Sequence, residues 1–326
     1  MSARSTVPPF LLVAAGASRL ADPARRAARV AATAAALEER TGAVPEVRLT
    51  ETAAAGRGAA QEAVAAGASL LVIIGGDGSV RSVAAVLSGT GVALGIVPGG
   101  TGNLMASALG IPRAPERASA ALVTARERSI DVGRAWVGAA QAPTPFIVAA
   151  GVGFDARVMA ATTDRRKRSL GIGAYFAAAT AVAARIRPFS VRLVVDGVVH
   201  ETDALAVLVA NAGELVPGLL GPRLPLVPDD GILDVLVARG RGLAGGSRAA
   251  LELLLGRGIH AEIGAYATRF AARRVEVVVA AEEPIEVDGD VVGGGRLVAE
   301  IVPGALRVLV PVGAPGPRAR RATIRA

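Results

Sequence analysis

Two short glycine-rich stretches carry the residue types that phosphate chemistry needs. The first, at residues 75–79, reads Gly-Gly-Asp-Gly-Ser and directly follows an apolar run. The second, at residues 98–103, reads Pro-Gly-Gly-Thr-Gly-Asn and also follows an apolar run. Glycine lets backbone amides approach a phosphate closely, and Ser79 and Thr101 add hydroxyl donors. Each stretch therefore predicts an anion-binding loop.

Asp77, in the middle of the first stretch, helps to distinguish an anion-binding loop from an ordinary turn. In an ordinary strand-to-helix turn, Asp77 and Asn103 would simply cap the helices that follow. A carboxylate beside a bound phosphate is repulsive unless a cation or a proton lies between them. We therefore expect Asp77 to act as a ligand of a Mg²⁺-nucleotide or as a proton acceptor. A Walker-type loop is excluded, because Lys167 is the single lysine and follows neither stretch.

The elements that must position these loops alternate between strands and helices. Apolar runs bounded by glycine alternate with alanine-rich segments of helical spacing, which indicates a doubly wound parallel sheet. In such a sheet the loops at the carboxyl ends of neighbouring strands share one crevice. The expected strands lie within 9–19, 44–50, 69–76 and 91–100, and the expected helices within 21–42, 56–68, 77–87, 101–110 and 115–127.

The second half of the chain has a different pattern. Alternating strands separated by Asp-Gly pairs predict antiparallel hairpins, with helices at about 155–164, 169–187 and 244–256. The expected organisation is an α/β domain at residues 1–127, a β-rich α+β domain at 128–312 and a basic, disordered tail at 313–326.

Composition limits the function classes. The chain of 326 residues has no cysteine, which excludes disulfides, thiol nucleophiles and cysteine-bound metals. We see no secretion leader and no unbroken apolar run long enough for a membrane span, so we expect a cytoplasmic protein, with peripheral binding at the inner membrane face left open. A net charge of +8 favours an anionic partner. Scarce aromatic residues argue against nucleic acid.

The two loops in their context resemble a known family. "GGDGSVRSVAAVL" and "VPGGTGNLMASALGIP" are similar to the nucleotide-binding core of the diacylglycerol kinase catalytic family, above all its bacterial soluble lipid kinases. The segments "GVGFDARVMAATTDRRKRSLGIGAY", "LPLVPDDGILDV" and "IEVDGD" resemble later motifs of that family in the same order. NAD kinases and ATP-dependent phosphofructokinases share the first loop, so that loop alone indicates only a superfamily.

The resemblance implies a fold, a reaction and site residues. It implies an active-site cleft between the two domains, ATP and Mg²⁺ as cofactors, and phosphoryl transfer to a hydroxyl of diacylglycerol or a related lipid at a membrane surface. Asp230 would bind Mg²⁺ together with the carbonyls of Val227 and Ile232. Asp290 would accept the lipid proton, with Asp288 nearby and Asp77 as a further catalytic residue. The implied nucleotide contacts are Thr52, Gly75, Gly76, Asp77, Gly78, Ser79, Val80, Arg81, Gly100, Thr101, Gly102 and Asn103.

Several residues depart from the family pattern. Asp290 stands where the family usually has glutamate, and the first strand runs into Ala14–Ser18 rather than Asn-Pro-x-Ser-Gly. The alternatives are an NAD kinase-like enzyme and a non-catalytic nucleotide-binding or membrane-binding regulator of the same fold. Asp230 and Asp290 also fit plain hairpin turns, and Thr52 fits a loop near a helix start. The basic cluster at 165–168 would face anionic head groups or the nucleotide. A homodimer is left open.

Overall fold

The computed structural model describes residues 7–16, 20, 22–153, 187–212, 228–240 and 266–314. The chain divides into two compact units. The first comprises residues 1–131, 227–231 and 303–326, and the second comprises residues 132–226 and 232–302. Each unit is described by itself.

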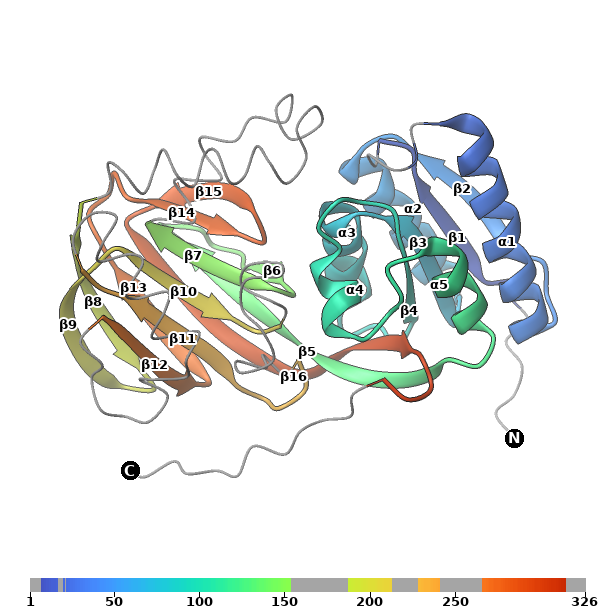
Figure 1. Cartoon of the computed structure of the whole chain (residues 1–326). Helices are drawn as coiled ribbons and strands as arrows, with labels where there is room; N and C mark the ends of the chain where they lie inside the picture. Colours follow the sequence, from blue (N-terminus) through green and yellow to red (C-terminus); the bar gives the residue numbers. More distant parts are fainter. Residues whose placement is uncertain are drawn as a thin grey trace. The chain divides into compact units, whose positions relative to one another are not determined.

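The first unit contains the parallel sheet that the sequence predicts. Its strands are β1 (Phe10–Ala14), β2 (Glu46–Thr50), β3 (Leu70–Gly75) and β4 (Ala93–Pro98). They lie in the order β2-β1-β3-β4, and each neighbouring pair is parallel (Figure 1). Strands β1, β3 and β4 are buried along their whole length, which explains their continuous apolar runs.

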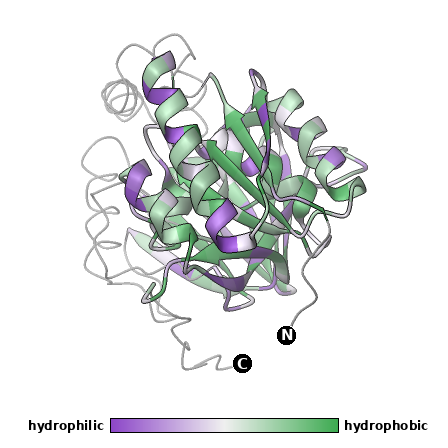
Figure 2. Cartoon of the chain, turned by 90° about the vertical axis from the view of Figure 1, so that its right-hand side faces the viewer, coloured by the Kyte–Doolittle hydropathy of each residue, from purple (hydrophilic) through white to green (hydrophobic). Residues whose placement is uncertain are grey.

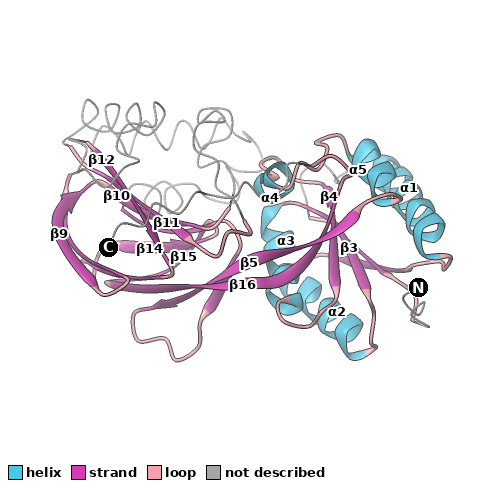
Figure 3. Cartoon of the chain, turned by 90° about the horizontal axis from the view of Figure 1, so that it is seen from below, coloured by secondary structure: helices cyan, strands magenta, loops and turns pink. Residues whose placement is uncertain are grey.

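Helices cover both faces of this sheet. They are α1 (Pro23–Thr41), α2 (Ala53–Ala65), α3 (Asp77–Leu87), α4 (Leu104–Ala108) and α5 (Pro115–Leu122). Helices α1 and α5 pack together over one face, and α2 and α3 pack together over the other (Figure 3). Their outer faces carry the hydrophilic residues, while the strands between them are hydrophobic (Figure 2). The doubly wound arrangement is confirmed.

The ends of α1 follow its sequence closely. The Asp22 side chain accepts a hydrogen bond from the amide of Arg25 at 3.0 Å, and Pro23 occupies the first turn. Gly42 ends the helix in the left-handed conformation, with φ of 76°.

The chain returns to the first unit after forming the second. Strand β5 (Arg126–Val137) leaves the first unit, and the long strand β16 (Arg296–Val310) comes back to it. Near its end β16 pairs with β4 in parallel, with Arg307 opposite Ala93. The expected boundary near residue 127 did not include this return, because sequence periodicity carries no information about which distant strand will pair.

The second unit is built from two layers of antiparallel strands. One layer contains the first part of β16, then β13 (Arg274–Val278), β8 (Phe189–Val195) and β9 (Val198–Ala204). The other follows the order β12 (Ala267–Ala272), β11 (Leu233–Ala238), β10 (Ala206–Ala210), β7 (Ala149–Gly153), β14 (Pro284–Val287) and β15 (Asp290–Gly294). Strand β6 (Thr144–Phe146) pairs with β5.

Buried side chains from both layers of the second unit form one core. On β11, for example, Leu233, Val235 and Val237 contribute to it, so alternate residues face inward. The β-rich second domain is confirmed. Its three expected helices lie almost wholly outside the described residues, and so does the tail beyond residue 314. Among the described helices, none is long and apolar enough to cross a membrane.

Candidate active site

The two glycine loops meet at the carboxyl ends of β3 and β4. Gly75 pairs with Pro98 at the end of the two strands, and the amide of Gly99 donates a hydrogen bond to the carbonyl of Gly75 at 2.8 Å. The structure thus brings together the two loops that the sequence singled out, on adjacent strand ends as predicted.

The glycines are required by the contact between the loops. A Cβ added to Gly100 would lie 2.6 Å from the Cα of Gly76, and one added to Gly99 would lie 3.2 Å from the backbone of Gly75. Real Cβ atoms essentially never come as close as the first distance. The two backbones therefore touch without intervening side chains.

Helix α3 begins inside the first loop. Its N-cap is Gly76, which has no side chain to cap the helix, and the amides of Ser79 and Val80 donate to the carbonyl of Gly76, each at 3.0 Å. An uncapped helix start carries partial positive charge and suits an anion. Ser79 is half-buried in this turn, whereas Val80 is 3% exposed and packs into the core. Val80 can therefore contact a ligand only through its backbone.

Asp77 connects the two loops. Its Oδ1 accepts a hydrogen bond from the amide of Leu104 at 2.7 Å, at the start of α4. Its Oδ2 would lie 2.7 Å from a Cβ at position 102, so Gly102 makes room for the carboxylate. Burial raises the pKa of Asp77, and the hydrogen bond from Leu104 partly opposes this. The carboxylate thus holds α4 against α3, a positioning contact that the sequence did not reveal. Its predicted role with Mg²⁺ or a proton stays a prediction.

Asn103 closes the second loop on itself. It adopts the left-handed conformation with φ of 51°, and its side chain makes no cap hydrogen bond to α4. Instead, its Oδ1 accepts from the amide of Gly100 at 3.0 Å, and its Nδ2 donates to the carbonyl of Gly100 at 2.7 Å. Asn103 therefore fixes the loop shape, while Thr101, two residues earlier, is exposed.

Thr52 caps a helix. It is the N-cap of α2, and its hydroxyl accepts a hydrogen bond from the amide of Ala55 at 3.1 Å. This helix cap explains why a threonine stands at position 52, even without a bound nucleotide. Thr52 is exposed, and its contact with the nucleotide stays a prediction.

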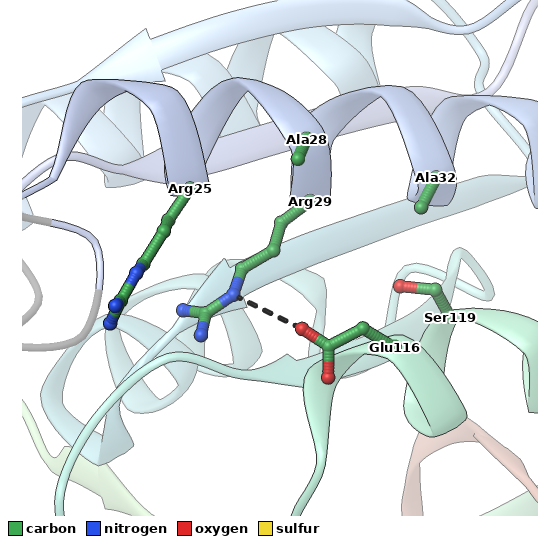
Figure 4. A pocket seen from close by; sticks show the side chains of 6 residues that line it. All are labelled: Arg25, Ala28, Arg29, Ala32, Glu116 and Ser119. Atoms are coloured by element: carbon green, nitrogen blue, oxygen red, sulfur yellow. Dashed lines mark ion pairs between the residues drawn. The ribbon is translucent and has the colours of Figure 1, made fainter.

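A separate hollow of about 360 Å³ lies between α1 and α5. Figure 4 shows Arg29 reaching toward Glu116 across it, with the guanidinium 3.7 Å from the carboxylate. None of the predicted site residues lines this hollow.

The turn that carries Asp230 is tightly held within the first unit. The Asp131 carboxylate accepts hydrogen bonds from the amides of Gly231 at 2.6 Å and Gly304 at 2.8 Å. The Arg128 guanidinium lies 2.6 Å from the Asp229 carboxylate. Asp230 itself is half-buried. The predicted partner Val227 lies outside the described residues, and Ile232 begins the return toward β11 in the second unit.

Asp288 has a structural environment in the second unit. Its carboxylate accepts hydrogen bonds from the amides of Ile147, Val148 and Ala149, each at 2.9 Å. Asp288 and Gly289 both have positive φ, of 48° and 87°, as a tight hairpin turn between β14 and β15 requires. The hairpin is therefore present, and the three bonds tie Asp288 to the backbone that enters β7. Its catalytic role stays a prediction.

Asp290 lies at the opposite side of the same hairpin. It is exposed and begins β15, where it pairs with Val287. Because its side chain is exposed, a substrate could reach it, and its role as the base stays a prediction. The basic cluster at 165–168 lies outside the described residues.

Sequence reasoning missed several buried acids, and two of them hold the turns that carry predicted site residues. Asp131 is 3% exposed and organises the Asp230 turn, as described above. Glu286 is 2% exposed on β14; its Oε2 accepts from the amide of Gly289 at 2.6 Å, and its Oε1 would lie 2.8 Å from a Cβ on Gly151. Side chains alternate along β14, so Glu286 points to the face away from the inward-facing Ile285 and Val287. From the sequence, that position would ordinarily be predicted to be exposed.

Comparison with known proteins decides the family. A model of the diacylglycerol kinase catalytic domain matches residues 23–135, and a model of the YegS C-terminal NAD kinase beta sandwich-like domain matches residues 147–310. A protein of Pseudomonas aeruginosa strain UCBPP-PA14 named "Probable lipid kinase YegS-like" is 34% identical over 82% of this chain and 85% of its own length. The chain belongs to the diacylglycerol kinase catalytic family of lipid kinases.

Other family members agree in sequence and in fold. A protein of Mycobacterium tuberculosis strain H37Rv named "Diacylglycerol kinase" is 33% identical over 76% of this chain and 79% of its own length. The crystal structure of a diacylglycerol kinase from Bacillus anthracis strain Sterne has the same fold, with a TM-score of 0.70 and 18% identity over 94% of this chain and 98% of that one. Both glycine loops lie in the catalytic-domain match, whereas Asp230, Asp288 and Asp290 lie in the C-terminal match.

Proposed function

We propose that this lipid kinase family member transfers the γ-phosphate of ATP to a hydroxyl of diacylglycerol or a related lipid. The observation that carries the proposal is the pair of glycine loops in direct contact at the carboxyl ends of β3 and β4, next to the uncapped start of α3. A lipid acceptor lies in a membrane, so the protein would work as a peripheral enzyme at the inner membrane face.

The loops suit the phosphates of a nucleotide. Backbone amides at a helix start bind phosphate oxygens without a lysine, and the helix dipole adds attraction. The contact between Gly76 and Gly100 is made through backbone alone, so the two loops lie close enough to bind neighbouring phosphates of one nucleotide. Thr101 and Ser79 would add hydroxyl hydrogen bonds, and Arg81, half-buried on α3, would add charge.

The proposal places Mg²⁺ at Asp230. In the described ranges no three acidic or histidine side chains gather into a metal cluster. A hard cation held by one carboxylate, backbone carbonyls and water does not require such a cluster. Asp230 with the carbonyls of Val227 and Ile232 would hold the ion, and Asp131 with Gly231 would fix the turn that presents them. When bound, Mg²⁺ neutralises phosphate charge during transfer.

The remaining tasks are alignment and removal of one proton. The lipid hydroxyl must be held in line with the γ-phosphate, and its proton must leave as the new bond forms. Asp290 is the proposed acceptor, because it is an exposed carboxylate beside the fixed Asp288–Gly289 turn. Asp77 would keep the two phosphate loops together during the reaction.

The test is transfer of labelled γ-phosphate by the purified full chain with Mg²⁺. Lipid alcohols in mixed micelles and, separately, NAD serve as acceptors. Label in a lipid product supports the proposal and identifies the acceptor. Label in NADP alone would move the activity to that of an NAD kinase, and measured ATP binding without transfer to any acceptor would indicate a regulator.

A further inference from the structure

The outer edge of the parallel sheet carries an apolar surface. Strand β2 pairs with β1 on one side, and within the described residues no strand pairs with its other side (Figure 1). Val47 and Leu49 of this strand are 44% and 56% exposed, and Val44 just before it is 67% exposed. Soluble proteins usually protect such edges, since an open strand invites pairing with another chain.

The backbone of β2 is also available on this outer side. The amide of Glu46 donates to Pro9, and the carbonyl of Thr50 accepts from Ala15, so both residues direct their backbone groups toward β1. Backbone groups alternate in direction along a strand. Val47 and Leu49 therefore direct their amides and carbonyls outward, away from the sheet. Pro45 directs only a carbonyl outward, because proline has no amide hydrogen.

We propose that β2 pairs in antiparallel orientation with β2 of a second copy of this chain, extending the sheet across a twofold axis at Val47. In this register Val47 faces Val47 of the other copy, and their outward amides and carbonyls exchange two hydrogen bonds. Leu49 faces Pro45 of the other copy, and each Leu49 amide donates to a Pro45 carbonyl. Pairing about a twofold axis preserves the faces of the sheet, so Val47 and Leu49 of the two copies share one face.

Charge selects this register over the neighbouring one. With the axis at Val47, Glu46 of each copy faces Arg48 of the other. These two residues form a non-hydrogen-bonded pair, because their backbone groups point toward β1, and side chains come closest in such pairs. Within one copy the same two side chains form an ion pair along the strand, so the four charges alternate in sign. With the axis one residue further, at Arg48, the two Arg48 guanidinium groups would face each other and repel. The sequence Glu-Val-Arg is therefore self-complementary about its central valine.

The size of the contact sets its strength. Two five-residue strands placed side by side bury less than the 1,200–2,000 Å² that is typical of stable interfaces. We therefore expect a reversible dimer whose population rises with protein concentration. This inference does not depend on the reaction that the protein catalyses.

A charge-swap experiment tests the register with the full chain. Arg48→Glu places two carboxylates opposite each other in the homodimer, and Glu46→Arg places two guanidinium groups opposite each other. Sedimentation velocity over roughly a hundredfold range of concentration should show a dimer for the unmodified chain and roughly tenfold weaker dimerisation for each variant. An equimolar mixture of the two variants restores opposite charges and should dimerise again. Failure of the mixture to dimerise would overturn the register.

A second pair of variants separates pairing from folding. Val47→Pro removes an outward amide while leaving the bonds between β1 and β2, so it should abolish the dimer and retain the melting temperature within a few degrees. Val198→Lys, at a valine on β9 that is 59% exposed, is the control and should dimerise as the unmodified chain does. A chain that stays monomeric throughout, or a Val47→Pro dimer of undiminished affinity, would refute the proposal.

Discussion

Replacing Gly100 by alanine tests whether contact between the two glycine loops is essential. The new Cβ would lie 2.6 Å from the Cα of Gly76, whereas ordinary carbon contacts begin near 3.4 Å. One loop must therefore move by about 1 Å. Overpacking of this kind costs about 1–3 kcal/mol, and disruption of the nearby bond from Gly99 to Gly75 would add about 1 kcal/mol. We expect a total loss of about 2–4 kcal/mol in the free energy of unfolding.

Chemical denaturation and nucleotide binding measure the two consequences separately. The denaturation midpoint reports stability, and titration with ATP and Mg²⁺ reports whether the phosphate loops keep their shape. The matched control is Gly58→Ala on α2, where an added Cβ meets no atom within 4 Å; it should gain about 0.5–1 kcal/mol and bind ATP unchanged. A Gly100→Ala protein with unchanged stability and ATP affinity would show that the contact between the loops is not essential.

Four further variants address single groups of the site. Gly78→Ala adds a Cβ that meets no atom of the protein, so it should fold at least as well and weaken ATP binding; unchanged ATP affinity would place the nucleotide away from α3. Asp77 has a raised pKa, so the folded chain binds its proton more tightly than the unfolded chain, and this contribution to stability is lost as pH rises from the ordinary value through the raised one. Asp77→Asn should flatten that part of a plot of melting temperature against pH, and an unaltered plot would contradict the assignment. Asp288→Ala leaves three amides without their acceptor and should cost about 2–4 kcal/mol, whereas Asp290→Ala at an exposed position should change stability by less than about 0.5 kcal/mol and abolish lipid phosphorylation; a fully active Asp290→Ala enzyme would exclude it as the base.

Much of the first unit follows from local sequence. Continuous apolar runs predict buried parallel strands, and Asp22, Pro23 and Gly42 mark the ends of α1 where the structure has them. The order of strands and helices then places both glycine loops at carboxyl ends of the strands, without any knowledge of distant contacts. The glycine loops, their helix starts and the change to hairpins in the second half are all properties of neighbours in the chain.

Tertiary structure alone decided what several of these residues contact. The sequence marks Asp77 as an acid beside glycines, but only the approach of α4 makes it the acceptor for the amide of Leu104. Asp288 receives its three amides from a segment about 140 residues earlier. Glu286 occupies a position that alternation predicts to be exposed, and it is buried because Gly151 on a neighbouring strand leaves room for it. Such contacts depend on which distant segments pack together, and the periodicity of a single segment carries no record of its partners.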